Sequence, residues 1–263
     1  MEAVSTVDAI IIRSDIIDTE VLNNAKNLKI VVRAGAGYDN VDLGYASEKG
    51  VVVMNTPGQN SNAVAELVMG FMVYMSRNKF DGTSGSELKG KKIGLHAFGY
   101  VSKNVARIAK GFGMEVYAFD PFVNSEEFDK YGVKEIENVE ELYNICNFIS
   151  LHIPATEKTK KSINFELLNK LPQNACLINT ARKEVIDEEG LLQLMESRPD
   201  IKYVSDIKPD LADVFMEKYS KRVFFTPKKS GAQTAEANIN AGLAAATQIV
   251  EFFKNGDVKY KVN

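Results

Sequence analysis

Short apolar runs alternate with amphipathic stretches along almost the whole chain. The apolar runs predict strands at residues 9–13, 28–32, 51–54, 93–97, 114–119, 147–152, 175–180, 203–206 and 223–226. Helical periodicity predicts helices at residues 18–25, 60–78, 101–112, 125–131, 165–171, 187–197 and 235–253. Strands that alternate with helices indicate an α/β fold with parallel sheets, whose ligands bind at the carboxyl ends of the strands.

The segment 92–120 has the pattern of a dinucleotide-binding strand–helix–strand unit. The glycine-rich fingerprint of such units, G-x-G-x-x-G, reads here as Ala97-x-Gly99-x-x-Ser102. Gly99 keeps the position where a side chain would obstruct a pyrophosphate bound at the helix start. Asp120 ends the second strand, where an acid accepts from ribose hydroxyls and repels the 2′-phosphate of NADP. The segment therefore favours NAD, and the alternative is a strand–helix–strand unit that binds no ligand.

Two arginines stand at the ends of predicted strands near the start of the chain. Arg13 and Arg33 end consecutive strands, Arg33 runs into the turn Ala34-Gly35, and Asn55 ends the next strand. Because these strand ends meet at one edge of a parallel sheet, the cations could hold a small di-anion, with an arginine pairing bidentately with a carboxylate. The alternative is that both arginines are simply solvated at the ends of their strands. For one isolated arginine we would prefer this alternative.

Composition excludes several classes of function. The chain has 263 residues and a net charge of −3 with both signs interspersed, so neither nucleic acid nor an anionic membrane is an expected partner. The longest nearly apolar stretch, 65–75, is too short to span a bilayer. Cys146 and Cys176 lie in apolar contexts without metal-ligand spacing, which indicates reduced core residues of a cytoplasmic protein and no metal. The predicted helix 60–78 is apolar on two faces, as in a helix that joins two lobes or lies in a dimer interface.

Several longer stretches together resemble the D-2-hydroxyacid dehydrogenase family, and within it the phosphoglycerate dehydrogenases. The matching stretches are VVRAGAGYDNVDL (31–43), MNTPGQNSNAVAELVMG (54–70), GKKIGLHAFGYVSKNVARIAKGFGMEVYAFDPF (90–122), SLHIPAT (150–156), LINTARKEVIDEEGL (177–191) and TPKKSGAQTAEANINAGL (226–243). The resemblance implies two lobes: a Rossmann-type NAD-binding domain at 58–239, and a flavodoxin-like substrate domain at 1–57 and 240–263. It also implies NAD as cofactor, a homodimer formed through the 60–78 helix, and oxidation of 3-phospho-D-glycerate to 3-phosphohydroxypyruvate, the first step of serine biosynthesis.

The resemblance also implies roles for individual residues. Arg182 matches the arginine that binds the substrate carboxylate and polarises the reacting carbonyl. Asp206 matches an aspartate near the nicotinamide amide, and His152 a position that lines the adenosine pocket. The substrate-binding positions are Arg13, Arg33, Ala34, Gly35 and Asn55. The cofactor-binding positions are Gly99, Tyr100, Val101, Asp120, His152, Ile153, Pro154, Thr159, Thr180, Ala181, Asp206, Gly231 and Ala232.

The catalytic acid/base departs from the family pattern. The family has a histidine after a Thr-Pro pair, oriented by a glutamate, whereas this stretch reads Thr-Pro-Lys-Lys-Ser-Gly-Ala from Thr226. Counting back from the Gly-Ala pair assigns the position to Lys229, and counting forward from the proline assigns it to Lys228; we choose Lys229. The glutamate is missing too: Leu211 stands in its place, with Asp210 one residue away.

A lysine can replace the histidine if its pKa is lowered. With a pKa near 10.4 it is a ready acid for carbonyl reduction, but as a base for oxidation it must lose about three pKa units, which costs roughly 4 kcal/mol. An acidic partner would oppose that shift. We therefore interpret the replacement of the histidine by a lysine and the loss of the glutamate as one coupled exchange.

The second departure is at the start of the chain, where the substrate lobe lacks the leading strand and helix of the family. We expect an exposed sheet edge and a weakened lobe there. Two alternatives to the phosphoglycerate reaction stay open: an NAD(H)-binding relative without catalysis, and a dehydrogenase for another 2-hydroxy acid, such as the glycerate/hydroxypyruvate pair.

Overall fold

The computed structural model describes residues 4–263, which form two compact units. Residues 4–62 and Ala232–Asn263 make up unit 1, and Ala63–Gly231 make up unit 2. These divisions differ by a few residues from the boundaries predicted at 57/58 and 239/240. The predicted boundary at 239/240 falls inside helix α10 (Ala235–Asn255), which stays whole because its buried alanines pack on the unit 1 sheet.

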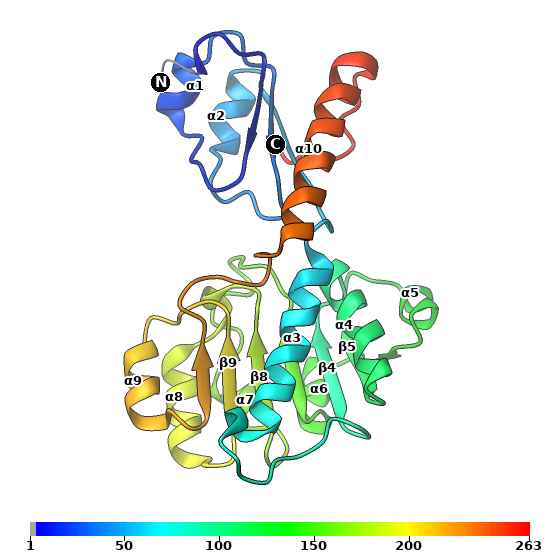
Figure 1. Ribbon diagram of the computed structural model, residues 1–263, viewed down its shortest axis with the longest axis vertical. Helices are drawn as coiled ribbons and strands as arrows, with labels where there is room; N and C mark the ends of the chain where they lie inside the picture. The colour runs from blue at the N-terminus through cyan, green and yellow to red at the C-terminus, as the bar shows by residue number, and fades with distance from the viewer. Residues whose placement is uncertain (1–3) are drawn as a thin grey trace. The chain divides into compact units, whose positions relative to one another are not determined.

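Unit 1 is built on a parallel three-stranded sheet in the order β1-β2-β3. Its strands are β1 (Ala9–Ile12), β2 (Ile30–Arg33) and β3 (Val52–Asn55). Helices α1 (Thr19–Asn24) and α2 (Leu43–Glu48) cover one face and α10 covers the other (Figure 1). β1 pairs only with β2 among the described residues, and Ile11 is 46% exposed.

Unit 2 contains a seven-stranded parallel sheet in the order β10-β9-β8-β7-β4-β5-β6. Its strands are β4 (Lys92–His96), β5 (Glu115–Phe119), β6 (Lys134–Glu135), β7 (Phe148–Leu151), β8 (Cys176–Asn179), β9 (Lys202–Ser205) and β10 (Val223–Phe225). The chain runs outward from β4 through β5 to β6 and then returns to β7 on the other side of β4. The strand order therefore reverses between β4 and β7, the point where open α/β sheets bind ligands at the carboxyl ends of their strands. The predicted α/β class with a Rossmann-type domain is confirmed.

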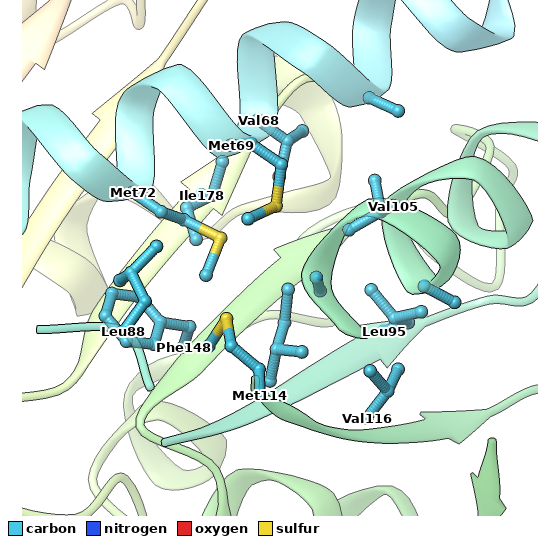
Figure 2. Close-up of a cluster of buried hydrophobic side chains, with 14 of the residues drawn as sticks. Val68, Met69, Met72, Leu88, Leu95, Val105, Met114, Val116, Phe148 and Ile178 are labelled. Carbon is cyan, nitrogen blue, oxygen red and sulfur yellow. The ribbon is translucent and has the colours of Figure 1, made fainter. Parts of the chain in front are cut away.

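Helices cover both faces of the unit 2 sheet (Figure 1). One side carries α3 (Ser61–Ser76), α4 (Tyr100–Gly111) and α5 (Ser125–Lys130). The other carries α6 (Val139–Ile145), α7 (Phe165–Leu168), α8 (Glu188–Ser197) and α9 (Ala212–Tyr219). Figure 2 shows the first of these cores, where Met69 and Met72 of α3 point toward Met114, Phe148 and the strands. Packing of this kind explains why α3 is apolar on two faces.

Several short elements were not predicted from the sequence. Among the described residues these are α2, α6, α9, β6 and the 3₁₀ helices η2 (Asn78–Phe80) and η3 (Lys183–Val185). Their periodicity is too short to recognise, and tertiary contacts hold them: α6, for example, buries Leu142 and Tyr143 under the sheet. The helix predicted at 165–171 ends earlier, at Leu168.

Helices long and apolar enough to cross a membrane are absent from residues 4–263. The same part of the chain contains no cluster of histidine, cysteine, aspartate or glutamate side chains suited to a metal ion.

Candidate active site

The turn between β4 and α4 has the geometry of a pyrophosphate-binding loop. Gly99 is the N-cap of α4, and the helix begins without a side-chain cap, so its first amides are not engaged by the N-cap residue. A Cβ added at Gly99 would meet no protein atom within 4 Å. Glycine is therefore not required there by internal packing, and the space above the helix start is open to a ligand. This observation fits a bound dinucleotide.

Ala97, at the first fingerprint position, adopts a backbone conformation that normally favours glycine. Its φ is +81°, in the left-handed region. The Ala97 amide donates to the carbonyl of Phe119 (2.9 Å), and its own carbonyl accepts from the Ser102 hydroxyl (2.6 Å). The serine that replaces the third fingerprint glycine thus ties the strained turn to the first turn of α4.

Asp120 is fixed beside this turn by two backbone amides. One carboxylate oxygen accepts from the Phe98 amide (2.8 Å) and the other from the Phe122 amide (3.0 Å). Each oxygen retains lone pairs for further donors such as ribose hydroxyls. The two amides could not be identified from the sequence, because backbone donors leave no residue-type signal.

Two histidines lie where the strand order reverses. His96 ends β4, and His152 follows β7 and donates its amide to the His96 carbonyl (2.9 Å). Burial lowers the pKa of His96 to about 4 and the pKa of His152 to about 3, so both rings are neutral at physiological pH. His96 Nδ1 lies 3.1 Å from the Tyr143 hydroxyl. That neither histidine is the catalytic acid/base stays a prediction.

The loop after β7 is organised by a predicted cofactor-binding residue. The Thr159 hydroxyl donates to the Pro154 carbonyl (2.5 Å) and accepts from the Thr156 amide (2.7 Å). Ile153 is buried, and Pro154 is exposed. Thr159 therefore holds Pro154 in place near the carboxyl end of β7.

Three predicted cofactor-binding residues carry buried polar atoms without a hydrogen-bond partner in the described part of the protein. They are Nε2 of His152, Oγ1 of Thr180 and Oδ1 of Asp206. Buried polar atoms are nearly always paired, so such atoms are candidates for contact with a bound molecule. Together with the open space at Gly99, they make the residues present compatible with NAD.

Arg182 and Lys229 meet at one carbonyl oxygen. Arg182 Nη1 donates to the Ala181 carbonyl (2.9 Å), and Lys229 Nζ donates to the same oxygen (3.5 Å). The two cationic nitrogens are therefore no farther apart than the sum of these distances. Asn179, at the end of β8, shapes the turn: its side chain accepts from the Ala181 amide (3.0 Å) and donates to the Arg182 carbonyl (2.9 Å).

Asp206 anchors the loop that carries Lys229. Its carboxylate oxygen Oδ2 accepts from the amides of Gly231 (2.6 Å) and Ser230 (3.2 Å), and its carbonyl accepts from the Thr226 hydroxyl (3.0 Å). Burial raises the pKa of Asp206, while the Gly231 amide and the charge of Lys229 act in the opposite direction. A Cβ at Gly231 would lie 2.9 Å from Oδ2, so this close approach requires glycine.

The two adjacent lysines differ in what they touch. Lys229 Nζ lies at the Ala181 carbonyl, whereas the contacts of Lys228 are made by its backbone carbonyl, which accepts from the hydroxyls of Thr226 and Ser230 (both 2.7 Å). Asp210, next to the lost glutamate position, forms an ion pair with Lys183 (2.5 Å). That hydrogen bond raises the pKa of Lys183.

The predicted substrate residues of unit 1 lie together at the carboxyl edge of its sheet. Arg33 Nε donates to the Arg13 carbonyl (3.1 Å), and Arg13 Nη2 donates to the Ala232 carbonyl (3.1 Å). The Asn55 side chain donates to the Ala36 carbonyl (2.7 Å). Ala34 is buried and pairs with the Ile12 carbonyl (2.8 Å).

Gly35 makes room for the Arg33 guanidinium. It has a φ of +151°, and a Cβ at this position would lie 1.5 Å from Arg33 Nη1. The guanidinium therefore occupies the volume that any side chain at position 35 would take. The sequence placed Gly35 in the site but gave no indication of this contact.

Comparisons with known proteins agree with this geometry. Residues 63–217 match the family model described as D-isomer specific 2-hydroxyacid dehydrogenase, NAD binding domain. The chain is 34% identical to the hydroxypyruvate reductase of Thermotoga maritima, over 95% of the chain and 86% of the relative. It is 33% identical to the D-3-phosphoglycerate dehydrogenase of Methanocaldococcus jannaschii, over 100% of the chain and 53% of the relative. It therefore spans about half the length of that enzyme.

The fold is also similar to solved structures. The NAD⁺-bound 3-phosphoglycerate dehydrogenase of Entamoeba histolytica matches with a TM-score of 0.91 and 47% identity, covering 100% of this chain and 84% of that one. The apo D-lactate dehydrogenase of Escherichia coli matches with a TM-score of 0.82 and 25% identity, covering 100% of this chain and 88% of that one. The chain therefore belongs to the D-isomer-specific 2-hydroxyacid dehydrogenase family, and unit 2 contains the NAD-binding domain of that family.

Proposed function

We propose that the chain is an NAD-dependent dehydrogenase that oxidises 3-phospho-D-glycerate to 3-phosphohydroxypyruvate, reversibly, as the first step of serine biosynthesis. The observation that carries the proposal is the position of Arg182 and Lys229 at the Ala181 carbonyl. It supplies one permanent cation and one titratable amine side by side. The 47% identity to the enzyme of E. histolytica supports the choice of substrate.

Each residue has a role in the proposed reaction. Arg182 pairs with the substrate carboxylate and polarises the C2 oxygen. Lys229 Nζ, as the neutral amine, takes the proton of the C2 hydroxyl during oxidation, and as the ammonium it returns the proton during reduction. When bound, NAD supplies the acceptor for the hydride from C2. Arg13 and Arg33 of unit 1 are proposed to bind the anionic groups of the substrate.

Two charged groups lie near Lys229, whose side chain is exposed. Arg182 contacts the same carbonyl oxygen as the lysine, and the lysine interacts electrostatically with the carboxylate of Asp206. The carboxylate nearest the lost glutamate position, Asp210, is paired with Lys183. This pairing supports the hypothesis that the histidine and glutamate were exchanged together, since a free acid beside Lys229 would oppose deprotonation.

The test compares two adjacent lysines. Lys229→Ala should lower the rate of NADH oxidation by phosphohydroxypyruvate by roughly 10²–10⁴-fold, the usual contribution of a general acid/base. Lys228→Ala is the matched control and should stay within a few-fold of wild type. Equal losses in both variants, or full activity of Lys229→Ala, would contradict the proposed role. NADH binding without substrate-dependent turnover in the wild type would identify a non-catalytic relative.

A second candidate is a reductase for hydroxypyruvate, which lacks the phosphate. It is favoured by the 34% identity to the T. maritima hydroxypyruvate reductase, of which the chain covers 86%. The two functions differ in kcat/KM for phosphohydroxypyruvate and hydroxypyruvate. If the phosphate is recognised by Arg13 or Arg33, replacing the arginine should lower kcat/KM for the phosphorylated substrate only.

The homodimer through residues 60–78 stays a prediction, as does a cytoplasmic location. The apolar side chains of α3 pack inside unit 2, and the exposed positions of this helix are Asn62, Glu66 and Gly70. An interface there would therefore rely on polar and backbone contacts rather than on an apolar face.

A further inference from the structure

Lys229 places a primary amine where the family pattern has a histidine. Both side chains can carry a proton, but their reactions with a ketone differ. A primary amine has two hydrogens to lose and can form a carbon–nitrogen double bond, whereas the ring nitrogens of an imidazole cannot. The oxidised substrate of a 2-hydroxyacid dehydrogenase is a ketone. The exchange of histidine for lysine therefore brings a second kind of chemistry to the site.

The Lys229 amine is exposed, and its hydrogen bond is long. Nζ donates to the Ala181 carbonyl over 3.5 Å, the weak end of hydrogen bonding, so an arriving ketone can displace this contact. Lys183, in the neighbouring turn, is instead held by the carboxylate of Asp210 (2.5 Å). An ion pair of this kind favours the ammonium form, which is not a nucleophile. Lys229 is therefore better placed than Lys183 to react with a ketone.

The backbone that carries Lys229 is fixed by Asp206. Oδ2 of this aspartate accepts from the amides of Ser230 and Gly231, and its carbonyl accepts from the Thr226 hydroxyl. The loop therefore holds the Cα of Lys229 in place. The flexible four-carbon stem of the side chain can still turn the amine toward a bound molecule.

Arg182 supplies the group that orients a 2-keto acid beside this amine. A guanidinium binds a carboxylate through two parallel hydrogen bonds, and the ketone carbon C2 is bonded directly to that carboxylate. Arg182 Nη1 and Lys229 Nζ donate to the same Ala181 oxygen, at 2.9 and 3.5 Å. A keto acid on Arg182 therefore has its C2 one bond from the anchored end. A rotation of the lysine stem brings Nζ to the distance of attack, about 3–3.5 Å.

We propose that Lys229 forms an imine with C2 of a 2-keto acid that Arg182 holds by its carboxylate. The inference rests on the proposed function, in which this keto acid is the product of oxidation. The lone pair of Nζ adds to C2, and the carbonyl oxygen takes a proton. The resulting carbinolamine loses that oxygen as water while the carbon–nitrogen double bond forms. Both hydrogens of the neutral amine leave in the water, so the step needs no oxidant or reductant.

The imine occupies the same nitrogen that is proposed to move the proton of the C2 hydroxyl. The keto acid should therefore arrest the enzyme when it binds before the reduced cofactor. We expect preincubation with phosphohydroxypyruvate to cause a progressive loss of initial NADH oxidation that recovers after dilution, as water hydrolyses the imine. Because only the neutral amine adds to a ketone, this loss should accelerate about tenfold per pH unit while the ammonium form predominates.

Reductive trapping identifies the nitrogen that reacts. The 263-residue chain, without NAD(H), is incubated with phosphohydroxypyruvate and sodium cyanoborohydride, which reduces an imine to a stable secondary amine. Peptide mass spectrometry should find Lys229 heavier by the mass of the keto acid less one oxygen atom. This labelling should exceed that of the adjacent Lys228 at least about tenfold, because only Lys229 lies beside the bound carboxylate. Lys229→Arg keeps the positive charge but removes the primary amine, and should abolish the label at this position.

Lys79 is a control within the same protein. Burial lowers the pKa of Lys79, which favours its neutral amine. Its Nζ donates to the carbonyls of Ser220 and Val223 at the start of β10. It therefore lies at the amino ends of the strands, whereas Arg182 follows the carboxyl end of β8. If the arginine-bound carboxylate directs the reaction, Lys79 stays unlabelled although its amine loses a proton more easily than an ordinary lysine.

A second ketone tests the need for the carboxylate. Dihydroxyacetone phosphate has the phosphate and the ketone of phosphohydroxypyruvate but carries a hydroxymethyl group in place of the carboxylate. Using this probe, or replacing Arg182 by alanine, should each lower the labelling of Lys229 about tenfold or more, because each removes the charged hydrogen bonds that hold the keto acid.

Labelling of Lys229 that depends on both the carboxylate and Arg182 supports the proposal. An unlabelled Lys229 would overturn it, as would equal labelling of Lys228 or Lys79 or equal labelling by dihydroxyacetone phosphate. The proposed reaction is judged separately, by substrate-dependent NADH oxidation and its loss in Lys229→Ala. Turnover without labelling contradicts only the imine, and labelling without turnover contradicts only the dehydrogenase reaction.

Discussion

Replacing Gly35 with alanine should damage substrate binding while leaving the NAD-binding domain intact. The new Cβ would lie 1.5 Å from Arg33 Nη1, a distance that excludes coexistence of the two groups. Nη1 and Cζ of Arg33 must therefore move, which disturbs the hydrogen bond from Nε to the Arg13 carbonyl. The φ of +151° at position 35 adds backbone strain for any residue with a side chain.

The magnitude follows from these two effects. Backbone strain at such a position costs about 1–3 kcal/mol, and a lost hydrogen bond from a charged group costs about 1.5–3 kcal/mol. Because the guanidinium is the movable end of a flexible side chain, the sum of the two is an upper bound, and we expect the free energy of unfolding to fall by at most about 2.5–6 kcal/mol. If Arg33 contacts the substrate anion, losing that contact should raise KM for phosphohydroxypyruvate about 10- to 100-fold. KM for NADH should stay within about twofold, because all the predicted cofactor-binding residues except Ala232 lie in unit 2, away from both changes.

The assay is steady-state NADH oxidation with each substrate varied in turn, combined with urea unfolding. Gly44→Ala is the control in the same unit: Gly44 lies in α2, and its added Cβ would approach only Asp42 Oδ1, at 3.6 Å. That change should stabilise the helix by about 1 kcal/mol and leave KM unaffected. An unchanged KM for phosphohydroxypyruvate in Gly35→Ala would refute the assignment of Arg33 to the substrate.

Three further predictions follow from the geometry of unit 2. Ala97→Gly should raise the free energy of unfolding by about 0 to 1.6 kcal/mol, because relief of the left-handed strain at φ +81° (about 1–2 kcal/mol) is at least as large as the cost of the added freedom of the unfolded chain (about 0.4–1 kcal/mol). A loss above about 1 kcal/mol on urea unfolding would contradict this reasoning. The pKa of His96 is lowered to about 4, so the contribution of its neutral ring to stability is present above the unfolded pKa near 6.5 and is lost as the pH falls toward 4. Between these two pH values, His96→Asn should reduce the slope of the unfolding free energy against pH by about 1.4 kcal/mol per pH unit. Identical slopes in variant and wild type would exclude a buried neutral ring. The pKa of Asp206 is raised by burial, so its favourable contribution to stability exists below the unfolded pKa and is lost as the pH rises through the folded pKa. The Asp206→Asn variant should therefore melt at a higher temperature than wild type at neutral pH and show no such gain near about pH 3. Its turnover should fall, because the loop that carries Lys229 loses its anionic anchor.

Local patterns were sufficient to predict much of unit 2. The strand, turn and helix around Gly99 follow from the residues within one short segment, and Asp120 follows the fingerprint at the expected distance. Hydrophobic periodicity depends on neighbours in the chain, so it predicts long elements well. It could not predict α6 or α9, whose few turns are stabilised by burial of residues such as Tyr143 and Phe215.

The sequence by itself determined the class of fold, the family, the nucleotide-binding segment and the unusual lysines after Thr226, because each depends on residue types in a fixed order. Only the tertiary structure decided which of those lysines lies beside Arg182, since Ala181 and Lys229 are 48 residues apart and meet through the packing of β8, β9 and the loop held by Asp206. The same holds for α10. Its periodicity shows two apolar faces, but the docking of the small alanines on the sheet decides that the larger side chains remain outside.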